Sequence, residues 1–262
     1  MSFRASCPWI ILVQRWKMTL VQGGIMKSSY LLHLDNSYTD STFRRKVEYI
    51  KYNFGALIHN TKKDKDVCVL EIGPGRGEFV KYLNDNEIKN IDIVDNDKEV
   101  LNFVKEKFYV TNAFLSGNLT SINNDLRKYS VIILVQLLEH LPPKVYFSFI
   151  KTLYSKLKPN GSILIVVPNA NNPLGLVERY GDLQHENSFT EQSLIDLVHG
   201  SGIDNYNVEI KAYSIPPTDI LNVIRIMLQK VLHFFILAIM IINGGTYFKI
   251  MTPNIALIIR KT

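Results

Sequence analysis

Three glycines at alternate positions follow a short apolar segment, and this stretch has the clearest capacity for chemistry. Residues 67–72 are rich in β-branched side chains, which favours a strand buried on both faces. Gly73, Gly75 and Gly77 come next, and apolar residues at helical spacing follow them. Glycine lets the backbone approach a ligand closely, and the free N–H groups of a helix start face an anion or a dipole. The sequence therefore predicts a strand, a ligand-binding glycine loop and a helix.

The residues around the loop restrict the class of ligand. A dinucleotide fingerprint would have glycine where this chain has Glu78, and no Lys-Ser or Lys-Thr pair follows, which excludes a P-loop. Glu71, two residues before the first glycine, suits a ligand with an ammonium group. Asp95 directly follows a second apolar segment, 90–94, and lies 18 residues after the last glycine. A carboxylate at about this spacing can accept hydrogen bonds from both ribose hydroxyls.

Two histidine segments later in the chain can supply a proton acceptor. His140 follows the apolar segment 129–135, at the expected end of a strand. Asp182 precedes His185 by three residues in a polar segment, and such an acid can orient an imidazole as a base. His185 held by Asp182 is therefore the first candidate base and His140 the second. The alternative for each is a hydrogen bond that only fixes a loop.

Four motifs resemble the class I S-adenosylmethionine-dependent methyltransferases, above all their type 11 and type 23 families. E-x-G-x-G-x-G at 71–77 resembles their motif I, and L-E-H-L at 138–141 resembles the segment after their fourth strand. L-K-P-x-G at 157–161 and D-x-x-H-x-x-x-F-T-x-x-S-L at 182–194 are similar to further segments, the latter to type 23 enzymes of polysaccharide gene clusters. The resemblance covers roughly residues 42–262.

The resemblance implies S-adenosyl-L-methionine as cofactor and assigns residues to it. Relatives often carry Gly-Asp at the end of the third strand, and Asn118 can accept the same adenine hydrogen bond through its amide oxygen. Gln136 corresponds to a position that borders the sulfonium and the methyl acceptor. The cofactor-binding residues that we predict are Glu71, Gly73, Gly75, Gly77, Asp95, Asn96, Gly117, Asn118, Leu119, Gln136 and Leu137.

Composition excludes several other classes. The net charge is +6 with a pI near 9.1, but the basic residues are scattered, so we expect no nucleic-acid partner. The two cysteines, Cys7 and Cys68, provide neither a disulfide framework nor a metal site, so no metal is expected. A reducing cytoplasm is the simplest location for such a chain.

The elements that must position these residues alternate between strand and helix. We predict an α/β fold: a Rossmann-like, seven-stranded, mostly parallel sheet with helices on both faces and, by the resemblance, an antiparallel last strand. Residues 1–25 are expected to be a disordered or misassigned extension, 26–65 an N-terminal helical cap and 66–262 the methyltransferase domain. The strands are expected at 67–72, 90–94, 108–115, 129–135, 162–167, 207–213 and 254–259, and the main helices at 42–58, 98–107, 144–157 and 191–199.

An apolar helical insertion at about 218–247 precedes the last expected strand. Its uniformly apolar part, 231–242, is interrupted only by His233 and is too short to span a bilayer. Arg225 and Lys230 give its first half a polar side, so the segment is either a core helix or an interfacial helix on a membrane. The second alternative implies a peripheral protein on the inner face of the membrane.

The sequence thus predicts methyl transfer to an oxygen or nitrogen of a small molecule or glycan, with cell-surface polysaccharide biosynthesis as the expected setting. A quinone-like or lipid acceptor at the membrane is the alternative. A non-catalytic methyltransferase-like docking subunit and a nicotinamide-dependent oxidoreductase are further alternatives. Glu78 and the lack of a Tyr-x-x-x-Lys pair near the fourth strand argue against the oxidoreductase.

Overall fold

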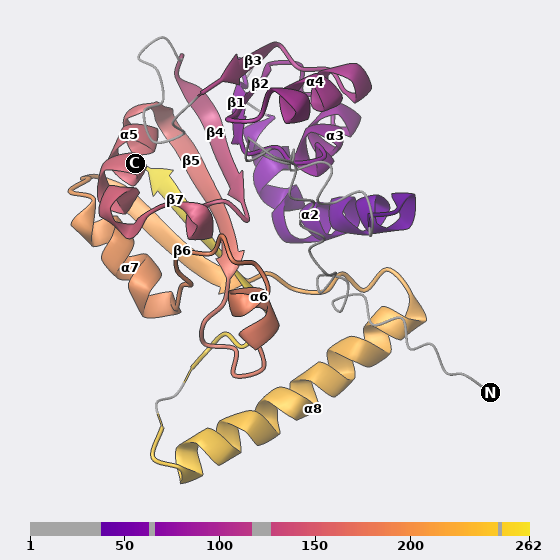
Figure 1. Cartoon of the computed structure of the whole chain (residues 1–262), viewed down its shortest axis with the longest axis vertical. Coiled ribbons are helices and arrows are strands. Elements are labelled where there is room, and N and C mark those ends of the chain that lie inside the picture. Colours follow the sequence, from indigo (N-terminus) through magenta and orange to yellow (C-terminus); the bar gives the residue numbers. More distant parts are fainter. Residues whose placement is uncertain (1–37, 63–65, 117–126, 246–247) are drawn as a thin grey trace, which may run out of the picture.

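The computed structural model describes residues 38–62, 66–116, 127–245 and 248–262. Within these residues one seven-stranded sheet has the order β3-β2-β1-β4-β5-β7-β6 (Figure 1). Only β7 runs antiparallel to its neighbours, which confirms the predicted fold. The strands are β1 (Val69–Ile72), β2 (Ile91–Asp95), β3 (Asn112–Leu115), β4 (Tyr129–Val135), β5 (Leu157–Pro168), β6 (Tyr206–Ala212) and β7 (Asn254–Lys261).

The register of the central strands brings the predicted site residues to one edge. Ile72 at the end of β1 pairs with Val94 of β2 on one side and with Leu134 of β4 on the other. The residues that follow these positions therefore leave the sheet together. Because the strand order reverses between β1 and β4, this edge is the switch point at which open α/β sheets bind ligands.

Helices cover both faces of the sheet, as the buried, mostly apolar central strands require. On one face α2, α3 and α4 pack through residues such as Phe54, Phe79 and Val104, and on the other α5 and α7 pack through residues such as Phe149 and Leu197. The helices are α2 (Asp40–Thr61), α3 (Glu78–Asp85), α4 (Lys98–Lys107), α5 (Tyr146–Ser155), α6 (Leu176–Tyr180), α7 (Glu191–Gly200) and α8 (Ile220–Ile242), with two short 3-10 turns, η1 (Leu138–His140) and η2 (Pro143–Val145).

Helix starts follow local side-chain chemistry closely. Asp97 caps α4 by accepting from the Glu99 N–H, and Thr190 caps α7 in a capping box. In the first helix the hydroxyl of Thr39 accepts from the Thr42 N–H, so α2 begins at Asp40, two residues before the expected start at 42.

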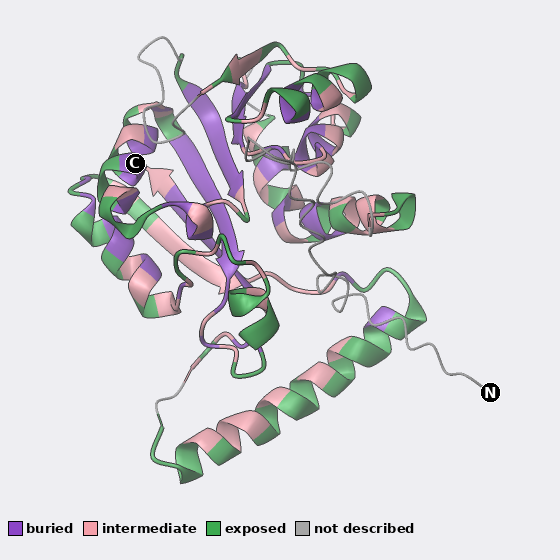
Figure 2. Cartoon of the chain, viewed as in Figure 1, coloured by how far each residue is buried: buried purple, intermediate pink, exposed green. Residues whose placement is uncertain are grey.

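Helix α8 is a single 23-residue helix that stands apart from the rest of the fold (Figures 1 and 2). Asn222 is its only buried residue, whereas Phe234 and Phe235 are 68% and 58% exposed. The alternative of a core helix is therefore wrong. By length and composition alone, the whole of α8 is long and apolar enough to cross a membrane. The sequence expectation considered only the shorter apolar run 231–242, which is too short.

Some predictions lie outside the described residues. These are the extension expected at residues 1–25 and the cofactor contacts of Gly117, Asn118 and Leu119, of which Asn118 is expected to contact the adenine.

Candidate active site

The glycine loop joins β1 to α3 and has the backbone that its composition predicts. Gly73, Gly75 and Gly77 have φ angles of 70°, 54° and 80°, in the left-handed region that disfavours other residues. A Cβ on Gly77 would lie 2.8 Å from the Phe108 ring, and one on Gly73 would lie 3.2 Å from the Leu137 side chain. Glycine is therefore required both for the turn and for the close packing around it.

Two glutamates flank this loop in different electrostatic states. Burial, with a smaller contribution from Glu78, raises the pKa of the Glu71 carboxyl well above its usual range. Glu71 is 3% exposed, and its Oε2 has no hydrogen-bond partner within the described part of the chain. Burial also opposes ionisation of Glu78, but the Lys46 ammonium, 3.1 Å away, and the Tyr38 hydroxyl outweigh it and lower its pKa. An ammonium group beside Glu71 would supply the partner that Glu78 already has.

Asp95 lies at the end of β2, one strand from the glycine loop. The Asp97 N–H donates to Asp95 Oδ1 at 2.8 Å, which orients the carboxylate. The residue is 8% exposed, and burial raises its pKa to about 6. Asn96 beside it is exposed. A buried carboxylate with so few donors can accept two hydroxyl groups of a ligand.

Gln136 and Leu137 follow β4 on the other side of the loop. Gln136 has a φ of 52°, which is unusual for a residue with a side chain and marks functional sites. Its Nε2 donates to Asn254 Oδ1 at 3.0 Å, so the start of β7 holds the side chain. Leu137 packs over Gly73. The turn after β4 therefore borders the glycine loop directly.

His140 and His185 come together at the same edge of the sheet. Their ring centroids are 4.6 Å apart and the rings meet edge to face. Main-chain bonds produce this contact, because the N–H groups of Glu186 and Asn187 donate to the Glu139 carbonyl at 2.8 and 3.3 Å. The segment that carries His185 is thus tied to η1.

Burial controls the charge of the groups around this histidine pair. The Glu139 side chain is fully buried, which raises the pKa of its carboxyl to about 8. Burial also lowers the pKa of His140, and the neighbouring His185 lowers it further. A neutral His140 can accept a proton or bind an electrophile at neutral pH.

Asp182 does not hold the His185 ring in this structure. Its Oδ1 accepts from the Gln184 N–H at 2.8 Å, and His185 Nδ1 lies 3.3 Å from the Arg179 carbonyl. Asp182 acts on Glu139 and His140 through its charge, which raises the pKa of both groups. The assignment of Asp182 as the group that orients the base remains a prediction.

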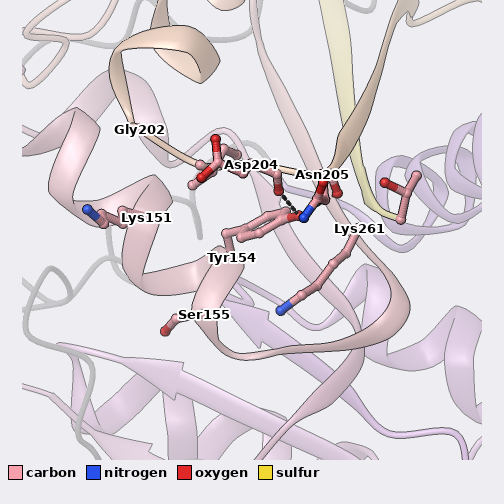
Figure 3. A pocket seen from close by; sticks show the side chains of 9 residues that line it. Lys151, Tyr154, Ser155, Gly202, Asp204, Asn205 and Lys261 are labelled. Carbon is pink, nitrogen blue, oxygen red and sulfur yellow. Dashed lines mark hydrogen bonds between the residues drawn. The ribbon is translucent and has the colours of Figure 1, made fainter.

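A pocket of about 350 Å³ occurs at the opposite edge of the sheet (Figure 3). Tyr154 lies across it, and its hydroxyl is 2.6 and 2.7 Å from the carbonyl oxygens of Asp204 and Asn205. Lys151 and Lys261 line it. The pocket lies at the end of β7 and the start of β6, away from the glycine loop, so we do not assign the active site to it.

The sequence did not indicate that Glu139 belongs with the two histidines. Among the described residues, one ligand atom each of Glu139, His140 and His185 lie within 4.8 Å of one another. His185 is 45 residues from His140, so only the fold shows their proximity. The Glu-His dipeptide at the end of a strand was the available signal.

Two solved structures resemble this chain in fold. The chain is similar to a SAM-dependent methyltransferase from Archaeoglobus fulgidus, with 23% identity, a TM-score of 0.57 and coverage of 89% of this chain and 100% of that one. It is also similar to the plantazolicin methyltransferase BamL in complex with a triazolic desmethylPZN analog and SAH, with 19% identity, a TM-score of 0.57 and coverage of 88% of this chain and 89% of that one. At these identities the likeness shows the fold.

A curated relative matches a shorter stretch. The chain is 39% identical over 67 residues to ribosomal RNA small subunit methyltransferase A of Prochlorococcus marinus (strain MIT 9312). This alignment covers 23% of the chain and 24% of that relative, so the chain spans about a quarter of the relative's length.

The family model described as a methyltransferase domain, type 23, matches residues 42–208. This range runs from α2 to β6 and contains the glycine loop, Asp95, Gln136 and both histidines. The chain therefore belongs to this methyltransferase domain family.

Proposed function

We propose that the protein transfers the methyl group of S-adenosyl-L-methionine to an oxygen of a small-molecule or glycan acceptor. The observation that carries this is the meeting at one sheet edge of a left-handed glycine loop, the buried carboxylate of Asp95 and the His140–His185 pair. The cofactor supplies an activated methyl group on sulfur. The protein's contribution is mainly to align the two reactants, which can lower a barrier by about 7–11 kcal/mol.

The residues present fit this cofactor. The glycines at 73, 75 and 77 allow the left-handed backbone of the loop, and glycine lets a backbone approach a ligand closely. The unpartnered Oε2 of Glu71 suits the ammonium group of the methionine part, and Asp95 suits the ribose hydroxyls. Solved relatives with SAH bound support the same cofactor.

The histidine pair favours an oxygen acceptor. A hydroxyl group must lose its proton as it is methylated, and a neutral imidazole is the side chain suited to accept that proton at neutral pH. His140 lies in η1, directly after β4 and the turn of Gln136, and His185, from the segment between α6 and α7, contacts its ring. The relatives named above act on RNA and on plantazolicin, and neither acceptor is inferred for this chain.

Helix α8 favours an acceptor that is presented at a membrane. The parallel strands β4 and β5 point toward α6 and α8, so the exposed helix lies beyond the edge that carries the site (Figure 1). Twenty-three residues extend about 34 Å. A glycan built on a lipid carrier fits this arrangement, and a quinone-like acceptor is the second candidate.

The connections of α8 support a position along the membrane surface. Ala212 of β6 and Ile255 of β7 are paired, so the segment that contains α8 leaves and re-enters the sheet at one place. A helix that crossed the bilayer would require a non-helical return through the hydrocarbon, which leaves backbone polar groups without partners. An interfacial helix needs no such return.

A thermal-shift measurement tests the proposed cofactor. The protein is heated with SAH, with NADH or with neither. SAH at 100 times its dissociation constant should add about 2.7 kcal/mol of stability and raise the midpoint by several degrees. A shift with NADH alone would indicate an oxidoreductase, and no shift with either ligand would favour a non-catalytic docking subunit.

A further inference from the structure

Three potential metal ligands meet at the carboxyl end of β4. Glu139 and His140 are neighbours in η1, and His185 comes from the segment before α7. One donor atom of each lies within 4.8 Å of the other two. Donors that share one ion at about 2.1 Å lie about 3–3.5 Å apart, so the three side chains would have to move closer by up to about 1–2 Å to hold an ion together.

The buried carboxyl group of Glu139 is the feature that points to a bound cation. Its side chain is 0% exposed, and neither carboxylate oxygen has a hydrogen bond of ordinary geometry in the described ranges of the chain; only its own main-chain N–H lies near enough to lower the pKa of the carboxyl. A buried carboxyl group without donors is costly, and such groups in native proteins usually mark a water or an ion. Nδ1 of His140 is also buried and lacks a partner there. A cation between these groups would satisfy both.

His185 is arranged as a metal-ligating histidine usually is. Its Nδ1 lies 3.3 Å from the Arg179 carbonyl, so the main chain can hold that N–H and leave Nε2 as the donor. Ligating histidines commonly donate their second ring N–H to a carbonyl or carboxylate in this way. The bonds from Glu186 and Asn187 to the Glu139 carbonyl fix the loop against η1, so the three side chains are held by the main chain.

We propose that Glu139, His140 and His185 bind a divalent transition-metal ion, and that this ion holds the oxygen of the methyl acceptor. Two imidazoles and one carboxylate suit zinc, cobalt, manganese or iron and leave coordination positions open. This differs from our expectation from the sequence, which considered cysteine ligands and predicted no metal.

The metal site deepens the proposed function and rests on it for its role in methyl transfer. An oxygen bound to a divalent ion loses its proton more readily, so the acceptor hydroxyl would release its proton to solvent water without a free imidazole as base. The oxygen would then bond to the methyl carbon as the sulfonium C–S bond breaks, and S-adenosylhomocysteine would leave. His140 and His185 then serve as ligands. The acceptor class that fits best carries an ionisable hydroxyl group, alone or beside a second oxygen that can occupy another open position.

Metal binding can be measured without methyl transfer. The full chain, with any affinity tag removed, is treated with a chelator, dialysed and titrated with Co²⁺ or Zn²⁺ by calorimetry, and its metal content is determined by mass spectrometry. We expect one ion per chain. His185→Ala and Glu139→Gln should each weaken binding by more than the about 10–100-fold that loss of an outer-shell partner costs.

Glu139→Gln keeps the shape of the buried side chain but cannot ionise to bind a cation, so this variant should fold even if His185→Ala is unstable. His199→Ala is the matched control, because His199 ends α7 and packs against Tyr206 outside the cluster. It should retain the ion. Absence of an ion in the wild-type chain, or equal loss in the His199 variant, would overturn the proposal.

The SAH shift separates this proposal from the function on which it rests. Metal binding that depends on Glu139 and His185 without any SAH binding would support the site and remove its role in methyl transfer. SAH binding without metal binding would leave the methyltransferase proposal intact and refute the metal site.

Discussion

Replacement of Asp95 by Asn should stabilise the ligand-free protein and weaken its binding of SAH. Asp95 is 8% exposed, and burial raises its pKa from 3.8 to about 6. At 1.36 kcal/mol for each tenfold change in proton affinity, this corresponds to a penalty of up to about 3 kcal/mol for the ionised group at pH 8. Asn is neutral, and its Oδ1 can still accept from the Asp97 N–H. We therefore expect a gain of about 1–3 kcal/mol.

The sign of the pH dependence follows from linkage. Because the folded state holds the Asp95 proton more tightly than the unfolded state, this residue lowers stability as the pH rises from about 4 to about 6, and the full penalty applies above that. The stability difference between Asp95→Asn and the wild type should therefore be largest near pH 8 and shrink toward pH 4. Urea unfolding at several pH values measures it.

Asp92 provides the matched control, as a buried carboxylate on the same strand with partners. Arg127 bonds it through two nitrogens at 2.9 and 3.0 Å, and the Tyr129 hydroxyl donates to it at 2.8 Å. Asp92→Asn faces these donors with an amide N–H₂ and should destabilise the fold by about 2–3 kcal/mol. Asp95→Asn should instead weaken SAH binding about 10–100-fold, as loss of hydrogen bonds to a charged group does. Equal destabilisation by both variants would refute this reasoning.

Two further pairs of variants test the glycine loop and α8. Gly77→Ala should destabilise the protein by about 1–3 kcal/mol and weaken SAH binding, because its Cβ would lie 2.8 Å from the Phe108 ring. Gly202 has a similar φ of 57°, but a Cβ there would meet open space. Gly202→Ala should therefore cost about 1 kcal/mol in urea unfolding and leave SAH binding unchanged in calorimetry. Phe234→Asp should reduce flotation with vesicles of anionic lipid, whereas Leu183→Asp, at a residue 90% exposed outside α8, should not. Equal flotation of both variants and the wild-type protein with the vesicles would exclude α8 as the membrane contact.

Local features of the sequence determined much of this protein. The sequence predicts a strand in each of the seven regions where the structure has one, and the central strands are mostly apolar because both of their faces are covered. The third strand was predicted from residue 108 but begins at Asn112, because such ends depend on pairing with β2. Caps such as Asp97 and Thr190 act within one helical turn, so the sequence alone identifies them.

Only the tertiary structure decided which distant groups meet and which surfaces stay exposed. Glu139 and His185 become neighbours through main-chain bonds between η1 and the segment before α7, and no local pattern encodes such a contact. The apolar residues of α8 are equally compatible with a core and with a membrane surface. The choice depends on whether another element covers the helix, and among the described residues none buries it beyond Asn222. Sequence patterns set the local chemistry, while packing sets proximity and burial, because both depend on residues far away in the chain.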